Sequence, residues 1–199
     1  MEKVSLTYFV DFVMKSGTPK LTVVRKFKER DDYDPQTDFY KKIRQGIVRL
    51  HREGKPKTEL DSLIAGLSDE KKQNAYPEIV SGYKKFLGSK KVKWFEPPQG
   101  DWTAGGLKVS VNPELGLEIN GQPFVLKLYF KDEALQKKRA EIVAHMMNVV
   151  LGPMSPSAAA FVVLDVRRGK SVQPPVPVAG HDALLAGEAA SFATMFANL

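Results

Sequence analysis

Apolar and polar positions divide the chain into a helical first half and a second half in which strands and helices alternate. Residues 6–17 form a short apolar segment that a helix cap at Ser5 or Thr7 opens and Gly17 ends. This arrangement favours a helix, although its β-branched and aromatic content also suits a strand. Residues 21–30 alternate less regularly and predict a strand or an extended arm. Residues 29–38 predict a solvent-exposed acidic turn.

The segment from residue 34 to residue 54 carries the clearest helix pattern. Asp34 followed by Pro35 is typical of a helix start, and apolar residues then recur at helical spacing up to Gly54: Phe39, Ile43, Ile47 and Leu50. The other side of this helix carries Lys41, Lys42, Gln45, Arg49 and Arg52. These residues are interpreted either as a surface that contacts phosphate groups or as the solvent-exposed side of an amphipathic helix.

Two further helices are predicted over residues 58–67 and 68–89. Acidic residues in the first turn of the second helix and lysines near its end favour it electrostatically. Pro77 is expected to kink or divide this helix. The composition then changes, because residues 92–95 predict a short strand and a loop rich in Pro and Gly follows.

Residues 107–151 form the segment around which the rest of the chain is organised. The pattern predicts a three-stranded meander, with Asn120-Gly121 as a hairpin turn, over residues 107–112, 117–120 and 123–130. The nearly continuous apolar sequence FVLKLYF indicates that the third strand is central and buried on both faces. Lys127 is the exception in this strand. Either its stem is buried and its ammonium reaches solvent or a carboxylate, or it projects into a functional site.

A helix that Asp132 caps is predicted to run to Leu151, and a strand over residues 157–166 follows it. Because a long helix precedes this strand, it should pair in parallel through a right-handed crossover. Basic residues lie on the polar side of the helix and just after the strand: Lys137, Lys138, Arg139, Arg167, Arg168 and Lys170. A proline-rich segment leads to a last helix, which docks on the body of the protein or on a second copy.

This order of elements predicts a single α+β domain, an α/β layer with a mixed sheet. N-terminal helices form a helical layer over residues 1–90. The meander, the crossover helix and the fourth strand form a core over residues 91–170. Residues 171–199 supply the proline segment and the C-terminal helix.

Composition narrows the functional classes. The chain of 199 residues contains no cysteine, which excludes disulfides and thiolate-based metal or redox sites. The net charge of +7 makes polyanions such as DNA or RNA the electrostatically favoured partners. Acidic residues near the N-terminus argue against a signal peptide, and no apolar run approaches the roughly 20 residues of a membrane span. We therefore expect a cytoplasmic protein without a membrane partner.

Aromatic and histidine side chains give no complete motif. Trp94 and Trp102 flank the Pro- and Gly-rich loop, where they serve either as platforms for stacked bases or as covers of the hydrophobic core. His51, His145 and His181 lie far apart along the chain without metal-ligand spacing, and we expect surface or helix-face positions for them. The sequence also lacks a G-x-S-x-G elbow and a phosphate-binding glycine loop.

The segments VSVNPELGL and VLK carry a resemblance to a known family. In their order of a helix, three strands, a helix and a fourth strand, residues 75–165 resemble the core of the PD-(D/E)XK nuclease-like superfamily, and residues 107–136 are similar to its RecB-type branch. The resemblance implies an acid at the end of the second core strand and an acid-x-lysine motif on the third, which hold a divalent ion and the attacking water. In this chain Asn112 and Val125 stand at the two acid positions, and only Lys127 is retained.

Other residues match the superfamily singly. Glu78 resembles the helix-borne acid of some members, and Gln136 is similar to a glutamine on the following helix. Magnesium prefers carboxylate oxygens, so the loss of both core acids counts against a metal-activated water. Glu114 and Glu118 are candidate replacements. Glu118 is the better one, although both also fit solvent-facing positions.

Three hypotheses follow. We favour a nuclease-like domain without catalysis and without a cofactor that binds DNA, RNA or a protein partner through ten basic residues: Lys41, Lys42, Arg49, Arg52, Lys137, Lys138, Arg139, Arg167, Arg168 and Lys170. The first alternative is a Mg²⁺- or Mn²⁺-dependent nuclease in which Glu78 and Glu118 replace the lost acids and Lys127 polarises the scissile phosphate. The second alternative is a structural or protein-interaction subunit that forms a homodimer through its C-terminal helix.

Overall fold

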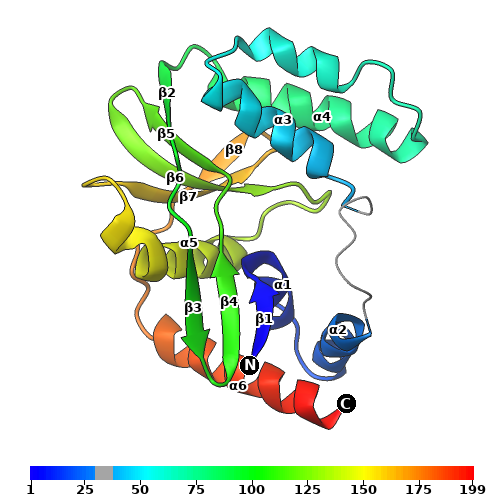
Figure 1. The fold of residues 1–199 in the computed structure, drawn as a ribbon, viewed down its shortest axis with the longest axis vertical. Helices are drawn as coiled ribbons and strands as arrows, with labels where there is room; N and C mark the ends of the chain where they lie inside the picture. Colours follow the sequence, from blue (N-terminus) through cyan, green and yellow to red (C-terminus); the bar gives the residue numbers. More distant parts are fainter. Residues whose placement is uncertain (30–37) are drawn as a thin grey trace.

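The computed structural model describes residues 1–29 and 38–199 and confirms an α+β fold with mixed sheets (Figure 1). The predicted helix start at Asp34 and Pro35 lies outside the described residues, but residues 38–40 are not helical: the helix begins only at Lys41, so the predicted extent is wrong there and Phe39 precedes the helix. A three-stranded sheet has the order β1 (Glu2–Ser5), β4 (Leu107–Val111) and β3 (Gly100–Ala104). A five-stranded sheet has the order β2 (Val92–Phe95), β5 (Leu115–Ile119), β6 (Gln122–Tyr129), β7 (Ala160–Asp165) and β8 (Lys170–Val172).

Helices make up the rest of the regular structure. They are α1 (Leu6–Val13), α2 (Thr18–Lys28), α3 (Lys41–Arg52), the 3₁₀ helix η1 (Lys57–Leu63), α4 (Glu70–Leu87), α5 (Lys137–Leu151), the short 3₁₀ helix η2 (Gly152–Met154) and α6 (His181–Asn198). The side chain of Ser5 accepts a hydrogen bond from the backbone N–H of Tyr8, which confirms the predicted cap of α1. Within residues 1–29 and 38–199, no helix combines the length and apolar character that a membrane crossing requires.

The strand or extended arm predicted at residues 21–30 is wrong, because residues 21–28 belong to α2. Pro19 occupies the first turn of this helix, where a missing N–H costs nothing. Val24 and Phe27, three residues apart, are its buried positions, and basic residues occupy its last turn. Spacing by three places both apolar side chains on one helical face, and this spacing outweighs the β-branched composition.

The predicted helical region between residues 58 and 89 forms with two differences. Residues 57–63 make a 3₁₀ helix, and α4 begins after Asp69, whose carboxylate accepts a hydrogen bond from the backbone N–H of Lys72. Pro77 lies inside α4 without dividing it. The neighbouring Tyr76, Ile79 and Val80 are buried, and their burial offsets the one backbone hydrogen bond that proline removes.

The expected three-stranded meander is only partly formed. β5 and β6 pair in antiparallel through the predicted Asn120-Gly121 turn, and β6 pairs in parallel with β7, so β6 is central as expected. β4 lies in the other sheet, because both of its edges are occupied by β1 and β3. The predicted loop after residue 95 contains β3, which pairs with one edge of β4.

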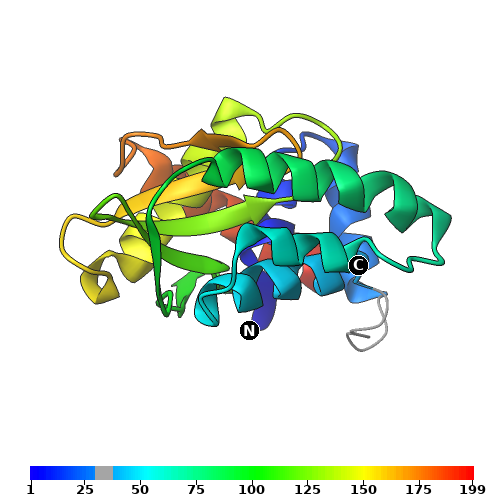
Figure 2. The same ribbon diagram turned by 90° about the horizontal axis from the view of Figure 1, so that it is seen from above.

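The five-stranded sheet separates two hydrophobic clusters. α3, η1 and α4 cover one face and bury side chains such as Ile43, Tyr76 and Leu126 with it (Figures 1 and 2). On the other face, α5 contacts β7 and also β3 and β4 of the smaller sheet. α1, α2 and α6 complete this second cluster. The helices of the first 90 residues therefore divide between the two clusters.

The C-terminal helix docks on the body of the protein, one of its two predicted positions. Its buried residues are Leu185, Ala189 and Phe192, and Phe192 packs edge-on against Phe12 and Phe27. An ion pair between Lys20 of α2 and Glu188 adds to this contact. The homodimer through this helix stays a prediction.

Candidate nucleic-acid interface

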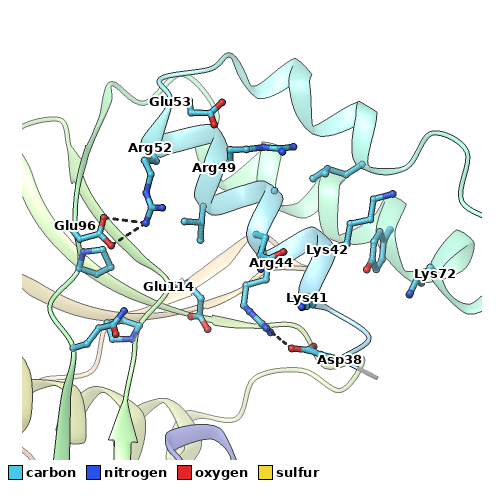
Figure 3. A pocket seen from close by; sticks show the side chains of 18 residues that line it. Asp38, Lys41, Lys42, Arg44, Arg49, Arg52, Glu53, Lys72, Glu96 and Glu114 are labelled. Carbon is cyan, nitrogen blue, oxygen red and sulfur yellow. Dashed lines mark hydrogen bonds and ion pairs between the residues drawn. The ribbon is translucent and has the colours of Figure 1, made fainter. Parts of the chain in front are cut away.

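A cleft of about 930 Å³ lies along the polar side of α3. Its other walls are the segment after β2, with Glu96 and Pro97, and the turn before β5, with Pro113 and Glu114 (Figure 3). The buried stripe of α3 determines which residues face this cleft. Gly46 belongs to that stripe, and a Cβ there would meet Leu63 at 2.5 Å, so glycine lets η1 pack closely against the helix.

Among residues 1–29 and 38–199, six basic side chains line the cleft: Lys41, Lys42, Arg44, Arg49, Arg52 and Lys72. Four of them are residues that the sequence predicted for phosphate contacts. The sequence analysis missed Arg44, although its position three residues after Lys41 on the same helix was a usable signal. Lys72 comes from α4, and no pattern along the chain indicates that it meets α3.

Each described acidic side chain in the cleft has a basic partner. Arg44 donates to Asp38 at 2.5 Å, and Arg52 donates to both carboxylate oxygens of Glu96 at 3.2 Å (Figure 3). The two other acids pair with lysines that are not among the lining residues: Glu53 with Lys55 at 2.8 Å, and Glu114 with Lys127 at 2.6 Å. The hydrogen bond from Lys55 lowers the pKa of Glu53.

Three described cations of the cleft form no ion pair, although the charge of Arg49, after that of Lys55, contributes to the lowered pKa of Glu53. Among the described residues, Lys41, Lys42 and Arg49 make no ion pair, and Lys42 and Arg49 are exposed. Lys72 is 3.9 Å from Asp69 and lies over the ring of Phe39. The cleft therefore keeps a positive surplus that is concentrated on α3.

The other predicted basic residues do not line this cleft. Lys137, Lys138 and Lys170 are exposed on other elements. Arg139 was expected on the polar side of its helix, and this is wrong: its side chain is 11% exposed and donates to Asp11 at 2.6 Å. The reason is that α5 lies between the two sheets, so both of its sides are covered.

Arg167 and Arg168 follow β7, and their side chains form hydrogen bonds within the protein. Arg167 donates to the carbonyl of Phe130 at 3.0 Å, to Glu78 at 2.8 Å and to Asp132 at 3.3 Å. Burial lowers the pKa of Arg167, but hydrogen bonds with Tyr40 and Glu78 outweigh this effect and raise it overall. Arg168 donates to the carbonyl of Asp132 at 2.6 Å and lies 3.4 Å from buried Asp165. We call Arg139, Arg167 and Arg168, with the acids Asp11, Asp132 and Asp165, the strand-end cluster.

Asp132 belongs to this cluster and does not cap the following helix. α5 begins only at Lys137, after Gln136. Residues 131–136 form the connection in between, where the backbone N–H of Leu135 donates to Asp165 at 3.1 Å. The predicted cap is thus four residues too early, because a loop anchored on Asp165 replaces the first predicted turn.

The three residues predicted for a nuclease do not form one group. Lys127 binds Glu114 and the carbonyl of Asn112, which confirms the interpretation of a buried stem that reaches a carboxylate. Glu118 pairs with Lys93, and its partner in the β5–β6 register is Pro123, about 13 Å along β6 from Lys127. Glu78 binds Arg167. Among the described residues, no three acidic or histidine side chains are grouped to hold a metal ion.

The histidines have structural partners. Burial lowers the pKa of His51 to about 4, and its Nε2 lies 2.5 Å from the hydroxyl of Tyr83. His145 lies on a helix, one of the two expected positions, but it is buried: its Nδ1 accepts from the backbone N–H of Val178 at 3.1 Å, and Nε2 lies 3.0 Å from Asp182. The rings of His145 and His181 are 5.4 Å apart, because α6 starts beside α5.

No protein-family model matches the chain, and a search of curated proteins found no match. The resemblance to the nuclease-like superfamily therefore stays a prediction from the sequence.

Proposed function

We propose that this protein is a nucleic-acid-binding domain that contacts phosphate groups through the cleft beside α3. The observation that carries the proposal is the charge balance of the cleft. Among the described residues, each acid of the cleft has a basic partner, whereas Lys41, Lys42 and Arg49 form no ion pair with a carboxylate. Unpaired cations gain from binding an anion, because no existing ion pair has to break.

The spacing of these cations suits a polyanion better than a single small anion. Lys41 and Arg49 are eight residues apart on one helix, which is about 12 Å along its axis. Phosphate charges on one strand of a duplex follow one another at about 3.4 Å along its axis, so this distance covers roughly three to four of them. Arg49 offers a planar guanidinium for two hydrogen bonds to a phosphate, and the lysines act as mobile point charges.

A comparison of two triple variants tests the proposal. The cleft variant carries Lys41→Ala, Lys42→Ala and Arg49→Ala. The matched control carries Lys137→Ala, Lys138→Ala and Lys170→Ala, and it loses the same charge from exposed positions on other elements. Fluorescence anisotropy with labelled single- and double-stranded DNA and RNA, at low salt and with chelator, should give an affinity about tenfold lower or more for the cleft variant only. Equal losses in both variants would contradict the proposal.

A second candidate function is metal-dependent cleavage, and one contact favours it. Glu114 lines the cleft and lies 2.6 Å from Lys127, so a carboxylate and a lysine adjoin the phosphate-binding surface. Both carboxylate oxygens are engaged, however, since Oε1 accepts from Lys127 and Oε2 accepts from the backbone N–H of Leu128 at 2.8 Å. A metal ion would have to displace these bonds.

Cleavage assays separate the two candidates. Incubation of the same nucleic acids with Mg²⁺ or Mn²⁺ should leave them intact if the cleft only binds. Cleavage that requires the metal, disappears in Lys127→Ala and Glu114→Gln, and persists in the matched control Glu118→Gln would favour the nuclease. Glu118 is a suitable control because it pairs with Lys93 away from the cleft.

A further inference from the structure

A second pocket adjoins the cleft at the C-terminal end of α3. It has a volume of about 230 Å³ and is bordered by apolar side chains, among them Leu50, Val92 and Trp94, and by Lys55, Lys57 and Lys90. None of the described residues that line it is acidic. Its volume is below the roughly 300–1,000 Å³ of pockets that enclose drug-sized ligands, so it suits one ring system and its attached phosphate.

Trp94 joins this pocket to the cleft. The guanidinium carbon of Arg52 lies 5.7 Å from the centre of the Trp94 ring, and Arg52 itself lines the cleft. Arg52 also donates to both carboxylate oxygens of Glu96, so its side chain lies between the tryptophan and the cleft. Trp94 is only partly buried and also lines the second pocket. An aromatic ring in this position can stack with a base of a strand whose phosphates lie along α3.

The lysines of the pocket are held at the end of α4. Lys57 donates to the carbonyl of Gly88 at 2.7 Å, and Lys90 donates to the carbonyl of Phe86. A lysine ammonium has three N–H donors, so each of these residues keeps donors for a further acceptor. Neither of them pairs with a carboxylate among the described residues. The hydrogen bonds to backbone carbonyls therefore place the ammonium groups of Lys57 and Lys90 at the pocket, where each can still bind an anion.

We infer that this pocket binds a nucleobase stacked on Trp94, with the adjoining phosphate at Lys57 and Lys90. If the base belongs to a bound strand, the inference rests on the proposed function of the cleft. A free nucleotide offers the pocket the same base and phosphate groups. Bases of a duplex are stacked on their neighbours, so occupation of the pocket requires an unpaired nucleotide. The protein should therefore bind single strands more tightly than duplexes. Loss of one base–aromatic stack lowers affinity by about 5- to 150-fold.

Tryptophan fluorescence provides a direct test. Trp102 packs against Phe9 in the core, so Trp102→Phe leaves Trp94 as the single reporter. The probes are a short oligothymidylate, a duplex of the same length, AMP and inorganic phosphate. We expect the oligothymidylate and AMP to quench Trp94, and we expect the duplex and inorganic phosphate to leave its emission unchanged.

Variants show whether the pocket contributes to affinity. Trp94→Leu should lose about 5- to 150-fold in single-strand affinity and keep duplex affinity. Lys57→Ala with Lys90→Ala should also weaken single-strand binding, and this pair carries the test if Trp94→Leu does not fold. Lys71→Ala with Lys85→Ala is the matched control, because both lysines are exposed on α4 and do not line the pocket.

Each outcome separates the pocket from the cleft. Salt-sensitive binding that Trp94→Leu and the lysine pair leave unchanged, without quenching, would overturn the pocket and keep the proposed function. Quenching by AMP without binding of any nucleic acid would support the pocket as a nucleotide site and overturn the proposed function. If neither AMP nor the oligothymidylate quenches Trp94, the inference is wrong.

Discussion

Basic side chains gather in two regions of this protein, the cleft beside α3 and the strand-end cluster. Each region brings together several arginines and acids, but the balance differs. In the strand-end cluster, Arg139, Arg167 and Arg168 all contact carboxylates. In the cleft, three of the six cations have no carboxylate among the described residues. Charge available to a ligand therefore depends on the partners of each cation and not on the density of basic residues along the chain.

Because of this difference, we expect the paired cations to affect the stability of the fold and the unpaired cations to affect ligand binding. A cation that is buried against a carboxylate contributes to folding, and its removal leaves an uncompensated charge. An exposed cation without a partner contributes little to folding and remains free to bind an anion. Substitutions in the strand-end cluster should thus reduce the free energy of unfolding, and substitutions in the cleft should reduce affinity.

The largest loss of stability is expected for Arg139→Ala. Arg139 is buried, donates to Asp11 and lies over the ring of Tyr129. Lys131 still pairs with Asp11 at 2.7 Å, so we expect a destabilisation of about 3 kcal/mol, at the low end for a broken buried pair. Urea denaturation measures it, and Lys138→Ala is the neighbouring exposed control. A change under about 0.5 kcal/mol would show that the pair is not important for folding.

The next largest effect on stability is the pH dependence that His51, in the last turn of α3, is expected to cause. Burial lowers the pKa of His51 from 6.5 to about 4 in the folded protein. Above pH 6.5 the ring is neutral in both states, so this contribution to stability is complete. Between pH 6.5 and about 4 the unfolded chain takes up a proton that the folded protein excludes, and stability falls by about 2–3 kcal/mol.

Urea denaturation at several pH values, with His51→Gln for comparison, measures this contribution. The difference in unfolding free energy between the wild type and the variant should shrink as the pH falls from 6.5 to 4. A difference that stays constant over this range would contradict the assignment.

A smaller loss of stability is expected for Arg167→Lys. The lysine keeps one positive charge but cannot reach the carbonyl of Phe130 and the carboxylates of Glu78 and Asp132 with one planar group. We expect a destabilisation of about 1–2 kcal/mol. Nucleic-acid affinity should remain unchanged. A reduced affinity at full stability would mean that the strand-end cluster also contacts the ligand.

The smallest change in stability is expected for the triple cleft variant. Lys41, Lys42 and Arg49 have no ion pair to lose among the described residues, and alanine is a good helix former. The free energy of unfolding should stay within about 0.5 kcal/mol of the wild type. A larger loss would indicate that these cations support the fold and would remove the distinction between the two regions.

The sequence predicted those parts of the fold that depend on local pattern. The hairpin at Asn120-Gly121, the parallel pairing of β7 with β6 and the buried stripe of α3 follow from turn chemistry and periodicity. The sequence did not predict that β4 belongs to the three-stranded sheet. Its partner β1 comes from the first residues of the chain, and a pairing over such a sequence distance leaves no local signal.

The sequence predicted the part of the candidate site that depends on the spacing of residues within one helix. Lys41, Lys42, Arg49 and Arg52 lie on one helix, so helical spacing alone brings them together. Whether Arg139 or Arg167 is available depends on Asp11 and Glu78, more than eighty residues away in the sequence. The partners that neutralise a charge come from tertiary packing, and the pattern of one segment does not contain them.

The salt dependence of nucleic-acid binding tests the central claim most directly. The logarithm of the observed binding constant for duplex DNA falls linearly with the logarithm of salt concentration, by about 0.9 for each neutralised phosphate. If Lys41, Lys42 and Arg49 contact phosphates, the slope for the triple cleft variant should be shallower than that of the wild type by about 2–3. The matched variant at Lys137, Lys138 and Lys170 should keep the wild-type slope. Equal slopes for the wild type and the cleft variant would contradict phosphate binding in the cleft.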